Sequence, residues 1–590
     1  MKHARLRRLS RVVALAAGAA LLLACTADRT TLPASDSANG NGGDGNASTP
    51  GDPGSSDVRF TLDATKMHPI SPFIYGVNEY AGYPSEWNDG IIPPWPKNLR
   101  LSRVGGNRWT AYNWENNASN AGNDASYSND GWLGGGDTPG EAVRTRVAAS
   151  RAAGAGILIT VPMIGYVAKD KSNVNVGTSE DSLATRLATH FVKSVPKKGT
   201  AFAYPPNAGD DAVYQDEFIW WLNQQFPGAA TDSTTPLFIS LDNEPDIWYS
   251  THEEIRSKVN GRDNLTGYDE LVQLTIAYAS AIKSQMPGVQ VFGPALATWN
   301  GDVNLYHNSS PDPAGRQFFL DYYLDKLHAA ETAQSRRLVD VLDLHWYPAA
   351  GTTAGSVDDD NAAQTPQMIQ ARLQAPRSLW DPTYVEGSWV SDVTQGPIRL
   401  IPRLKESIAA HDPGTKIAIT EYYYGRGGDI SGGLAQADVL GIFGREGVFA
   451  ATLWPNANIW ASPYGGSLAA AYAYVNGAFR MFRDYDGQQH AFGDIGIEAT
   501  TSDIATTSVY ASVDAKDPTR VIIVAINKTD ASKTASITLT AQQQFSVASV
   551  YAMTDGSPNP THQGDVPITK RNAFLYTMPS MSVSTLVLHN

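Results

Sequence analysis

Two glutamates stand directly after short apolar runs, where a pair of carboxyl groups can do acid–base and nucleophilic chemistry. Glu244 comes three positions after the run at 237–241, and Glu421 follows the run at 416–420 at once. A carboxyl kept protonated by burial can donate to a glycosidic oxygen while an ionised partner attacks the anomeric carbon. Either glutamate alone could equally be an ion-pair partner at a strand end. The pair at matched positions favours glycosidic bond cleavage.

Eight apolar runs are spaced along the chain as in a sheet that is buried on both faces. They are residues 73–75, 99–104, 157–163, 237–241, 289–292, 339–344, 416–420 and 448–453. Helical patterns lie between them, at 141–153, 268–286, 318–330 and 468–482. Eight βα repeats predict an α/β fold, a (β/α)₈ TIM barrel at residues 68–494 with its active site at the C-terminal strand ends. Glu244 and Glu421 follow the fourth and seventh strands, so both belong to that rim.

The pattern changes after residue 494, where β-rich runs follow one another without a helical stretch. The runs are residues 508–513, 519–527, 535–540, 545–553 and 581–589. They predict a second, smaller domain, an antiparallel β-sandwich at residues 495–590. Residues 58–67 contain a strand-like run ahead of the barrel, which we expect to join this sandwich.

The N-terminus has the layout of an export signal. Five basic residues within the first eleven precede an apolar run at 12–24, which is too short to span a bilayer comfortably. The run ends in Leu-Leu-Ala-Cys25, which resembles the lipobox of bacterial lipoproteins. We therefore predict a signal peptide at 1–24, a lipid anchor at Cys25 and a flexible linker at 25–57. An ordinary signal peptide with a chance cysteine is the alternative.

Composition excludes several classes of protein. The 590 residues carry a formal net charge of −14 and include one cysteine. The acidic balance argues against nucleic acid as a partner. One cysteine rules out an internal disulfide framework and a zinc site made of several cysteines.

Five stretches of the chain carry recognisable motifs in a fixed order. Residues 68–76, 105–116, 241–248, 343–348 and 420–441 contain, among others, Gly-Asn-Arg, Asn-Glu-Pro, His-Trp-Tyr-Pro and Ile-Ser-Gly-Gly. Asn-Glu-Pro occurs in many barrel glycosidases, whereas Gly-Asn-Arg and Ile-Ser-Gly-Gly are more specific. Over residues 58–590 the chain resembles glycoside hydrolase family 44, the endoglucanases and xyloglucanases. The resemblance implies that Glu244 is the general acid/base and Glu421 the nucleophile.

Polar residues near the same strand ends are candidates for binding the sugar. We expect Asn243 to bond a sugar hydroxyl, the 2-OH, although an Asn that caps the following turn is an equal alternative. Asn107 and Arg108 follow strand two, and Arg108 could orient Glu421 and favour its ionised form. The alternative for Arg108 is a structural ion pair at the barrel rim.

Two further candidates follow strand six. His345 and Tyr347 form a His-x-Tyr pair at the rim, which suggests a hydrogen bond to the nucleophile or to the bound sugar, although a lone histidine is more often a buried polar group. Tyr423 is a weaker candidate of the same kind.

Six tryptophans fall in loops or strand ends on the expected catalytic side, where indoles can stack on sugar rings. We single out Trp389 and Trp454 as substrate-binding residues. A single tryptophan is more often part of a core than of a sugar-binding site, and we make no binding prediction for the other four: Trp109, Trp114, Trp248 and Trp346.

Two acidic loops could bind a structural calcium ion, at residues 124–137 and 358–360. Neither matches an EF-hand, and a solvated acidic loop is the favoured interpretation. No cofactor is expected for catalysis.

The sequence therefore predicts a retaining endo-β-1,4-glycanase that acts on cellulose-like glucan or xyloglucan. We expect a monomer at the bacterial cell envelope or surface, held to the membrane through Cys25 or released outside the cell. One alternative is a surface lipoprotein that binds polysaccharide without cleaving it. Another keeps the mechanism but acts on xylan or mannan.

Overall fold

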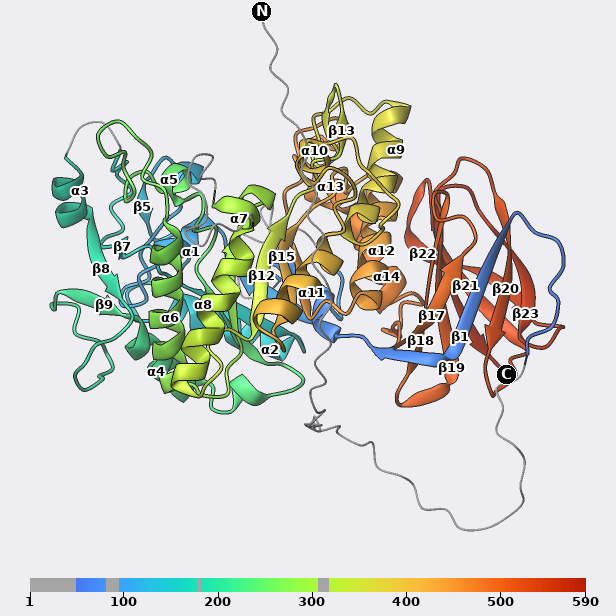
Figure 1. The fold of residues 1–590 in the computed structure, drawn as a ribbon, viewed down its shortest axis with the longest axis horizontal. Helices are drawn as coiled ribbons and strands as arrows, with labels where there is room; N and C mark the ends of the chain where they lie inside the picture. Colours follow the sequence, from blue (N-terminus) through green and yellow to red (C-terminus); the bar gives the residue numbers. More distant parts are fainter. Residues whose placement is uncertain (1–48, 81–94, 178–181, 306–317) are drawn as a thin grey trace, which may run out of the picture. The chain divides into compact units, whose positions relative to one another are not determined.

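Eight parallel strands close into a barrel, which confirms the predicted (β/α)₈ architecture (Figure 1). The computed structural model describes residues 49–80, 95–177, 182–305 and 318–590. In ring order the strands are β2 (Gly76–Asn78), β3 (Leu101–Val104), β6 (Gly156–Val161), β10 (Leu237–Leu241), β11 (Val291–Leu296), β12 (Val341–Trp346), β15 (Lys416–Tyr422) and β16 (Ala450–Leu453). Chain order and ring order are the same, as expected when each strand returns through a crossover to pair with the next.

Helices in the connections cover the barrel. The longer ones are α2 (Glu141–Ala152), α4 (Gln215–Gln225), α6 (Tyr268–Gln285), α8 (Phe319–Gln334), α9 (Pro366–Gln374), α11 (Leu400–His411), α12 (Ile430–Arg445) and α14 (Ala473–Arg483). The helix predicted at 468–482 is two helices, because α13 (Leu468–Ala471) ends at Tyr472 before α14 begins. Helix α12 is unusual, since every residue from Ile430 to Gly444 is buried.

The first barrel strand is displaced from its predicted position. Residues 73–75 were expected as a strand, but Pro72–Ile74 is a 3-10 turn and the strand β2 begins at Gly76. Proline at the first position fixes φ, and the Ser71 hydroxyl accepts a hydrogen bond from the Phe73 amide. These local bonds favour a turn over the extended chain that the apolar residues suggested.

The barrel interior changes from apolar to polar along its axis. Eight side chains, one from each strand or its approach, fill the end where the strands begin: Phe73, Leu101, Leu158, Phe238, Phe292, Val341, Ala418 and Ala450. Buried polar side chains replace them toward the other end, among them Asn78, Arg103, Asp343, His345 and Thr420. This polar layer supports the two glutamates.

The sandwich is one nine-stranded sheet in the order β22-β21-β24-β19-β18-β17-β1-β20-β23. Its strands are β1 (Val58–Pro69), β17 (Ile495–Thr501), β18 (Thr507–Asp514), β19 (Asp517–Asn527), β20 (Lys533–Thr540), β21 (Val547–Thr554), β22 (Ser557–Pro567), β23 (Ala573–Met578) and β24 (Ser582–His589). In Figure 1 the blue β1 lies among the red C-terminal strands, antiparallel to β17 and parallel to β20. Gly51 and Asp57 also bond to the sandwich, so the predicted flexible linker ends before Gly51.

The barrel and the sandwich belong to one compact unit and meet along α12 and α14. Asp438 of α12 forms a buried ion pair with Lys528 at 2.5 Å and accepts a hydrogen bond from the Tyr510 hydroxyl at 2.6 Å. The Tyr510 ring lies against Gly441, where a Cβ would come within 2.3 Å of it. The contact therefore depends on the glycine.

The predicted signal peptide, Cys25 and linker residues up to 48 lie outside the described residues. Within the described part, no helix has the length and apolar character needed to cross a membrane.

Candidate active site

Glu421 lies at the end of β15, where it is 5% exposed and held through both of its oxygens. Its Oε1 accepts a hydrogen bond from Nη1 of Arg103 at 2.7 Å. Its Oε2 accepts one from the Tyr347 hydroxyl at 2.9 Å, as expected for a tyrosine after strand six. Two donors on different strands therefore fix the orientation of this carboxylate.

Arg103, and not Arg108, orients Glu421. Arg108 pairs with Asp130 at 2.5 Å and so has the structural ion pair that was its alternative interpretation. Arg103 is fully buried within β3, and its Nη2 also donates to Asn243 Oδ1 at 2.7 Å. The sequence signal was available, because an arginine inside a buried apolar strand needs a partner carboxylate. Arg108 was favoured because it stands in a recognisable motif.

Glu244 lies beyond the end of β10 in a left-handed backbone conformation, with φ of 47°. Non-glycine residues pay about 1–2 kcal/mol for this conformation. The surrounding bonds hold it: the Glu244 amide donates to the Ala295 carbonyl at 2.9 Å, and the buried Asp242 carboxylate accepts from the Asn243 amide at 2.8 Å. Burial raises the pKa of Glu244 to about 7, against the lowering effect of the Arg103 charge. The carboxyl can therefore carry a proton near neutral pH.

His345 connects the two glutamates. Burial lowers its pKa to about 3, so the ring is neutral. Its Nε2 lies 3.4 Å from Nη2 of Arg103, which can only donate, so Nε2 is the acceptor and Nδ1 carries the hydrogen. Nδ1 then donates to Oε1 of Glu244 at 2.9 Å and lies 3.5 Å from Oε2 of Glu421.

Asn243 is fixed by the same arginine. Its Oδ1 accepts from Arg103 and from the Gly106 amide at 3.2 Å, which directs Nδ2 toward Asn107 Oδ1 at 3.3 Å. An amide nitrogen has two hydrogens, so one remains for a ligand oxygen. Asn107 in turn donates to Asp124 at 2.9 Å. The structure thus places Asn243 and Asn107 together beside Glu244 and Glu421.

The two carboxyl groups are close. One ligand-capable atom each of Glu244, His345 and Glu421 lie within 4.8 Å of one another, and this is the one such group of three found among the described residues. Both glutamates have partners that suit acid–base chemistry: an arginine and a phenol for Glu421, a neutral imidazole for Glu244. No cofactor is required to explain the arrangement.

The aromatic candidates separate into site and core. Trp454 lies over Gly106, where a Cβ would come 2.6 Å from its Cη2, and so stands next to Asn243. Trp389 begins the short helix α10 (Trp389–Thr394) and is 44% exposed, so it is available for stacking, and its role in binding stays a prediction. Tyr423 is fully buried and donates to Asp360 at 3.2 Å, so this residue is structural. The remaining candidates are buried in the core: Trp109, Trp114, Trp248 and Trp346.

The acidic loops use their carboxylates internally. Asp130 pairs with Arg108, and Asp137 pairs with Lys171 at 2.8 Å. Asp360 accepts hydrogen bonds from the Arg426 and Asn458 amides at 2.6 and 3.0 Å. Structural calcium at either loop stays a prediction.

A TIM barrel with a glutamate pair at the C-terminal strand ends, and a β-sandwich beside it, defines a glycoside hydrolase. The sequence profile of glycoside hydrolase family 44 matches residues 118–350. The chain is 36% identical over 546 residues to endoglucanase A of Paenibacillus lautus, covering 90% of this chain and 73% of the relative. The chain therefore belongs to glycoside hydrolase family 44.

Other relatives agree. The chain is 34% identical over 538 residues to a β-mannanase/endoglucanase A of Caldicellulosiruptor saccharolyticus, of which it spans 37%. Cel44A, a family 44 endoglucanase from Clostridium thermocellum, superposes with a TM-score of 0.80 at 34% identity, over 91% of this chain and all of that one. A Paenibacillus polymyxa xyloglucanase, solved with xyloglucan, superposes with the same TM-score and identity, over 90% of this chain and 99% of its own.

Proposed function

We propose that the protein hydrolyses β-1,4-glucans such as cellulose-like glucan and xyloglucan within the chain, with retention of anomeric configuration. The observation that carries the proposal is that one carboxyl oxygen of Glu244 and one of Glu421 lie within 4.8 Å of each other. Retaining glycosidases have carboxyl groups about 5–5.5 Å apart, whereas inverting enzymes need roughly 6.5–9.5 Å to admit a water molecule. The names of the relatives support the substrate class.

In the first step Glu421 attacks the anomeric carbon while Glu244 protonates the leaving oxygen. Arg103 donates to Oε1 of Glu421 and Tyr347 donates to Oε2, and Oε2, which lies 3.5 Å from His345 Nδ1, is the oxygen that attacks. His345 donates to Oε1 of Glu244, which leaves the acidic proton on Oε2. The free hydrogen of the Asn243 amide donates to the sugar 2-hydroxyl, a bond that strengthens in the transition state.

In the second step water hydrolyses the covalent glycosyl-enzyme. Glu244, now ionised, removes a proton from the water, which attacks the anomeric carbon and releases Glu421. A pKa near 7 suits both roles, because the group is protonated in one half-reaction and ionised in the other.

The test is Glu421→Gln on a panel of soluble β-glycans, scored for new reducing ends. The variant should remain folded and lose activity by roughly 10⁴-fold or more. Glu331→Gln is the matched control, a buried glutamate on the outer helix α8 that should keep full activity. Wild-type-like turnover by Glu421→Gln would reject the assignment. Failure of the wild type to release any reducing ends would favour a polysaccharide-binding protein.

The anomer of the first product tests the stereochemistry. Proton NMR of freshly cleaved cello-oligosaccharide should show the β-anomer appearing before the α-anomer. An initial α-anomer would mean inversion. Xylan and mannan belong in the substrate panel, because one relative is named a β-mannanase/endoglucanase and another a bifunctional glucanase-xylanase.

The proposal includes export and lipidation at Cys25, which rest on the sequence pattern alone. Mass spectrometry of the protein from its native membranes should find a diacylglyceryl group on Cys25 as the N-terminal residue. Cys25→Ala should release the protein from the membrane fraction. Equal membrane retention of the variant would reject the anchor.

A further inference from the structure

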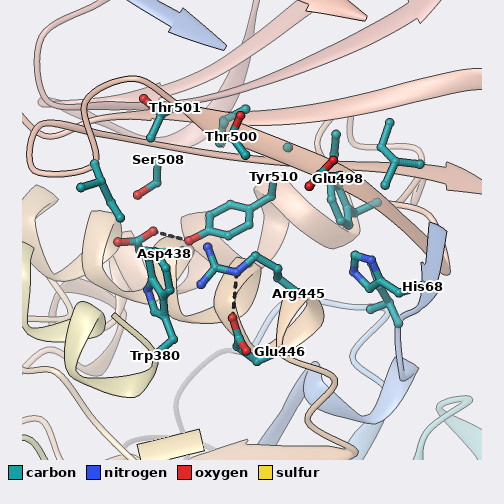
Figure 2. A pocket seen from close by; sticks show the side chains of 18 of the residues that line it. His68, Trp380, Asp438, Arg445, Glu446, Glu498, Thr500, Thr501, Ser508 and Tyr510 are labelled. Atoms are coloured by element: carbon teal, nitrogen blue, oxygen red, sulfur yellow. Dashed lines mark hydrogen bonds and ion pairs between the residues drawn. The ribbon is translucent and has the colours of Figure 1, made fainter. Parts of the chain in front are cut away.

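A cavity of about 540 Å³, which the proposed mechanism does not use, lies between the barrel and the sandwich (Figure 2). Its walls are the second half of α12, the turn that carries Trp380, and strands β17 and β18, with β1 at one side. We call it the interdomain cavity. Its volume falls within the range of small-ligand sites, about 300–1,000 Å³.

The interdomain cavity is remote from Glu421. Helix α12 begins at Ile430, just after the loop that follows β15, and ends at Arg445. At 1.5 Å per residue this helix is about 24 Å long. The cavity touches α12 at Asp438, Gly441 and Arg445, so it lies toward the opposite end of the barrel. It is therefore not an extension of the active site.

An arginine held between two aromatic rings forms one wall. Figure 2 shows the Arg445 guanidinium between Trp380 and Tyr510, with its Cζ 3.8 Å and 5.9 Å from the two ring centroids. Its Nε donates to Glu446 at 3.0 Å, while the buried Nη2 reaches no acceptor in the described part of the chain. The side chain is 29% exposed, so a ligand oxygen can approach it.

The charges around the cavity are compensated within the protein. Lys66 pairs with Glu498, and Lys528 pairs with Asp438. Glu446 compensates Arg445. Each of these cations already has a carboxylate partner, so the cavity suits a neutral ligand with hydroxyl groups, to which the partly exposed Arg445 side chain can donate.

The mouth of the cavity is apolar in part. Met67 is 59% exposed there and follows a register shift in β1 between Asp63 and Met67. Such bulges redirect side chains at the edge of a pairing. The exposed Met67 thioether offers an apolar surface in the wall of a cavity that Arg445 also lines. Pyranose rings have this same combination of apolar C–H faces and hydroxyl edges.

We propose that the interdomain cavity is a second carbohydrate-binding site, which holds a short segment of neutral β-glucan away from the catalytic glutamates. The choice of β-glucan rests on the proposed function. A chain bound there stays near the enzyme between cleavage events, since two linked sites raise the effective concentration of one polymer.

The test is calorimetric titration of cellotetraose into the inactive Glu421→Gln protein, which should bind two molecules per chain. Adding Arg445→Met, which removes the free donors, or Met67→Asp, which places a charge at the mouth, should reduce the stoichiometry to one. Val259→Asp is the matched control, because Val259 is 54% exposed and lies outside the cavity. This variant should keep two. Met67→Asp decides the matter if Arg445→Met does not fold.

One binding event in Glu421→Gln, or two events in both cavity variants, would overturn the inference. On the otherwise wild-type protein, Met67→Asp should raise KM for long glucan several-fold and leave cellotetraose hydrolysis unchanged. If the wild type cleaves β-glucan but the Glu421→Gln protein binds only one molecule of cellotetraose, this inference alone fails. If the wild type cleaves no β-glucan, the proposed function fails as well.

Discussion

The raised pKa of Glu244 determines where activity is lost as the pH rises. Burial moves that pKa from 4.5 to about 7, which favours the protonated form by roughly 3 kcal/mol. Because the leaving oxygen needs a proton, kcat/KM should be level below about pH 6, be about halved near pH 7 and fall about tenfold per unit at higher pH. At pH 8 about a tenth of the Glu244 side chains would remain protonated.

The perturbation is Glu244→Gln, which cannot titrate. We expect kcat/KM on soluble β-glucan to fall by about 10²–10⁴ and the residual activity to lose the limb near pH 7. A dinitrophenyl cello-oligosaccharide needs little protonation of its leaving group, so its cleavage should depend weakly on Glu244. Initial rates between pH 5 and 9 at constant ionic strength measure both effects. A wild-type profile that stays level to pH 9, or an unchanged limb in Glu244→Gln, would refute the reasoning.

Stability provides an independent check on the same group. The folded-state pKa of Glu244 lies above its unfolded value, so this carboxyl costs stability as the pH rises from about 4.5 to 7. Glu244→Gln should therefore unfold at a higher temperature than the wild type at pH 8, and the advantage should disappear near pH 4. A lower unfolding temperature for the variant at pH 8 would contradict the proposed burial effect.

Four more predictions follow. Arg103→Lys should lower kcat roughly 10²-fold with little change in KM, because a lysine cannot orient Glu421 and Asn243 together; an equal rise in KM would indicate a binding role instead. Lys528→Met should cost about 3–5 kcal/mol of stability, measured by calorimetry, since it leaves Asp438 buried and unpaired; a loss below 1 kcal/mol would reject the buried pair. Gly106→Ala should raise KM and reduce tryptophan quenching by substrate, because the added Cβ displaces Trp454; unchanged binding would place Trp454 outside the site. Chelator should leave turnover unchanged, whereas a fall in the unfolding temperature would reveal a structural calcium ion.

The sequence predicted the barrel well, because its strands are buried on both faces and read as continuous apolar runs. The strands at the sheet edges were harder to find. The strand β22 contains three prolines and mostly exposed polar residues, so it lacks the alternation that marks a half-buried strand. The first barrel strand was misplaced because Pro72 and Ser71 set a turn by local bonds that hydrophobicity does not report.

The candidate site shows the same division. Glu244, Glu421 and Tyr347 could be found by position, since the C-terminal ends of barrel strands converge at one rim. Arg103 was missed because its side chain lies inside a strand, and only the three-dimensional structure shows which carboxylate it faces. Tyr423 was chosen because it follows β15 closely in the sequence, but sequence position does not determine where a side chain points. The Tyr423 hydroxyl turns inward and donates to Asp360.

The position of β1 has a consequence for how the chain is made. The sandwich is completed by β1 at one end of the chain and by β17 to β24 at the other, so the whole catalytic barrel is an insertion between two neighbouring strands of one sheet. Roughly 425 residues separate β1 from its first partner. At synthesis rates of about 5–20 residues per second, about 20–85 s pass between the synthesis of β1 and that of its partner strand β17. The barrel must therefore fold while β1 is still unpaired. A truncated chain without the C-terminal domain would leave β1 without the strands with which it pairs.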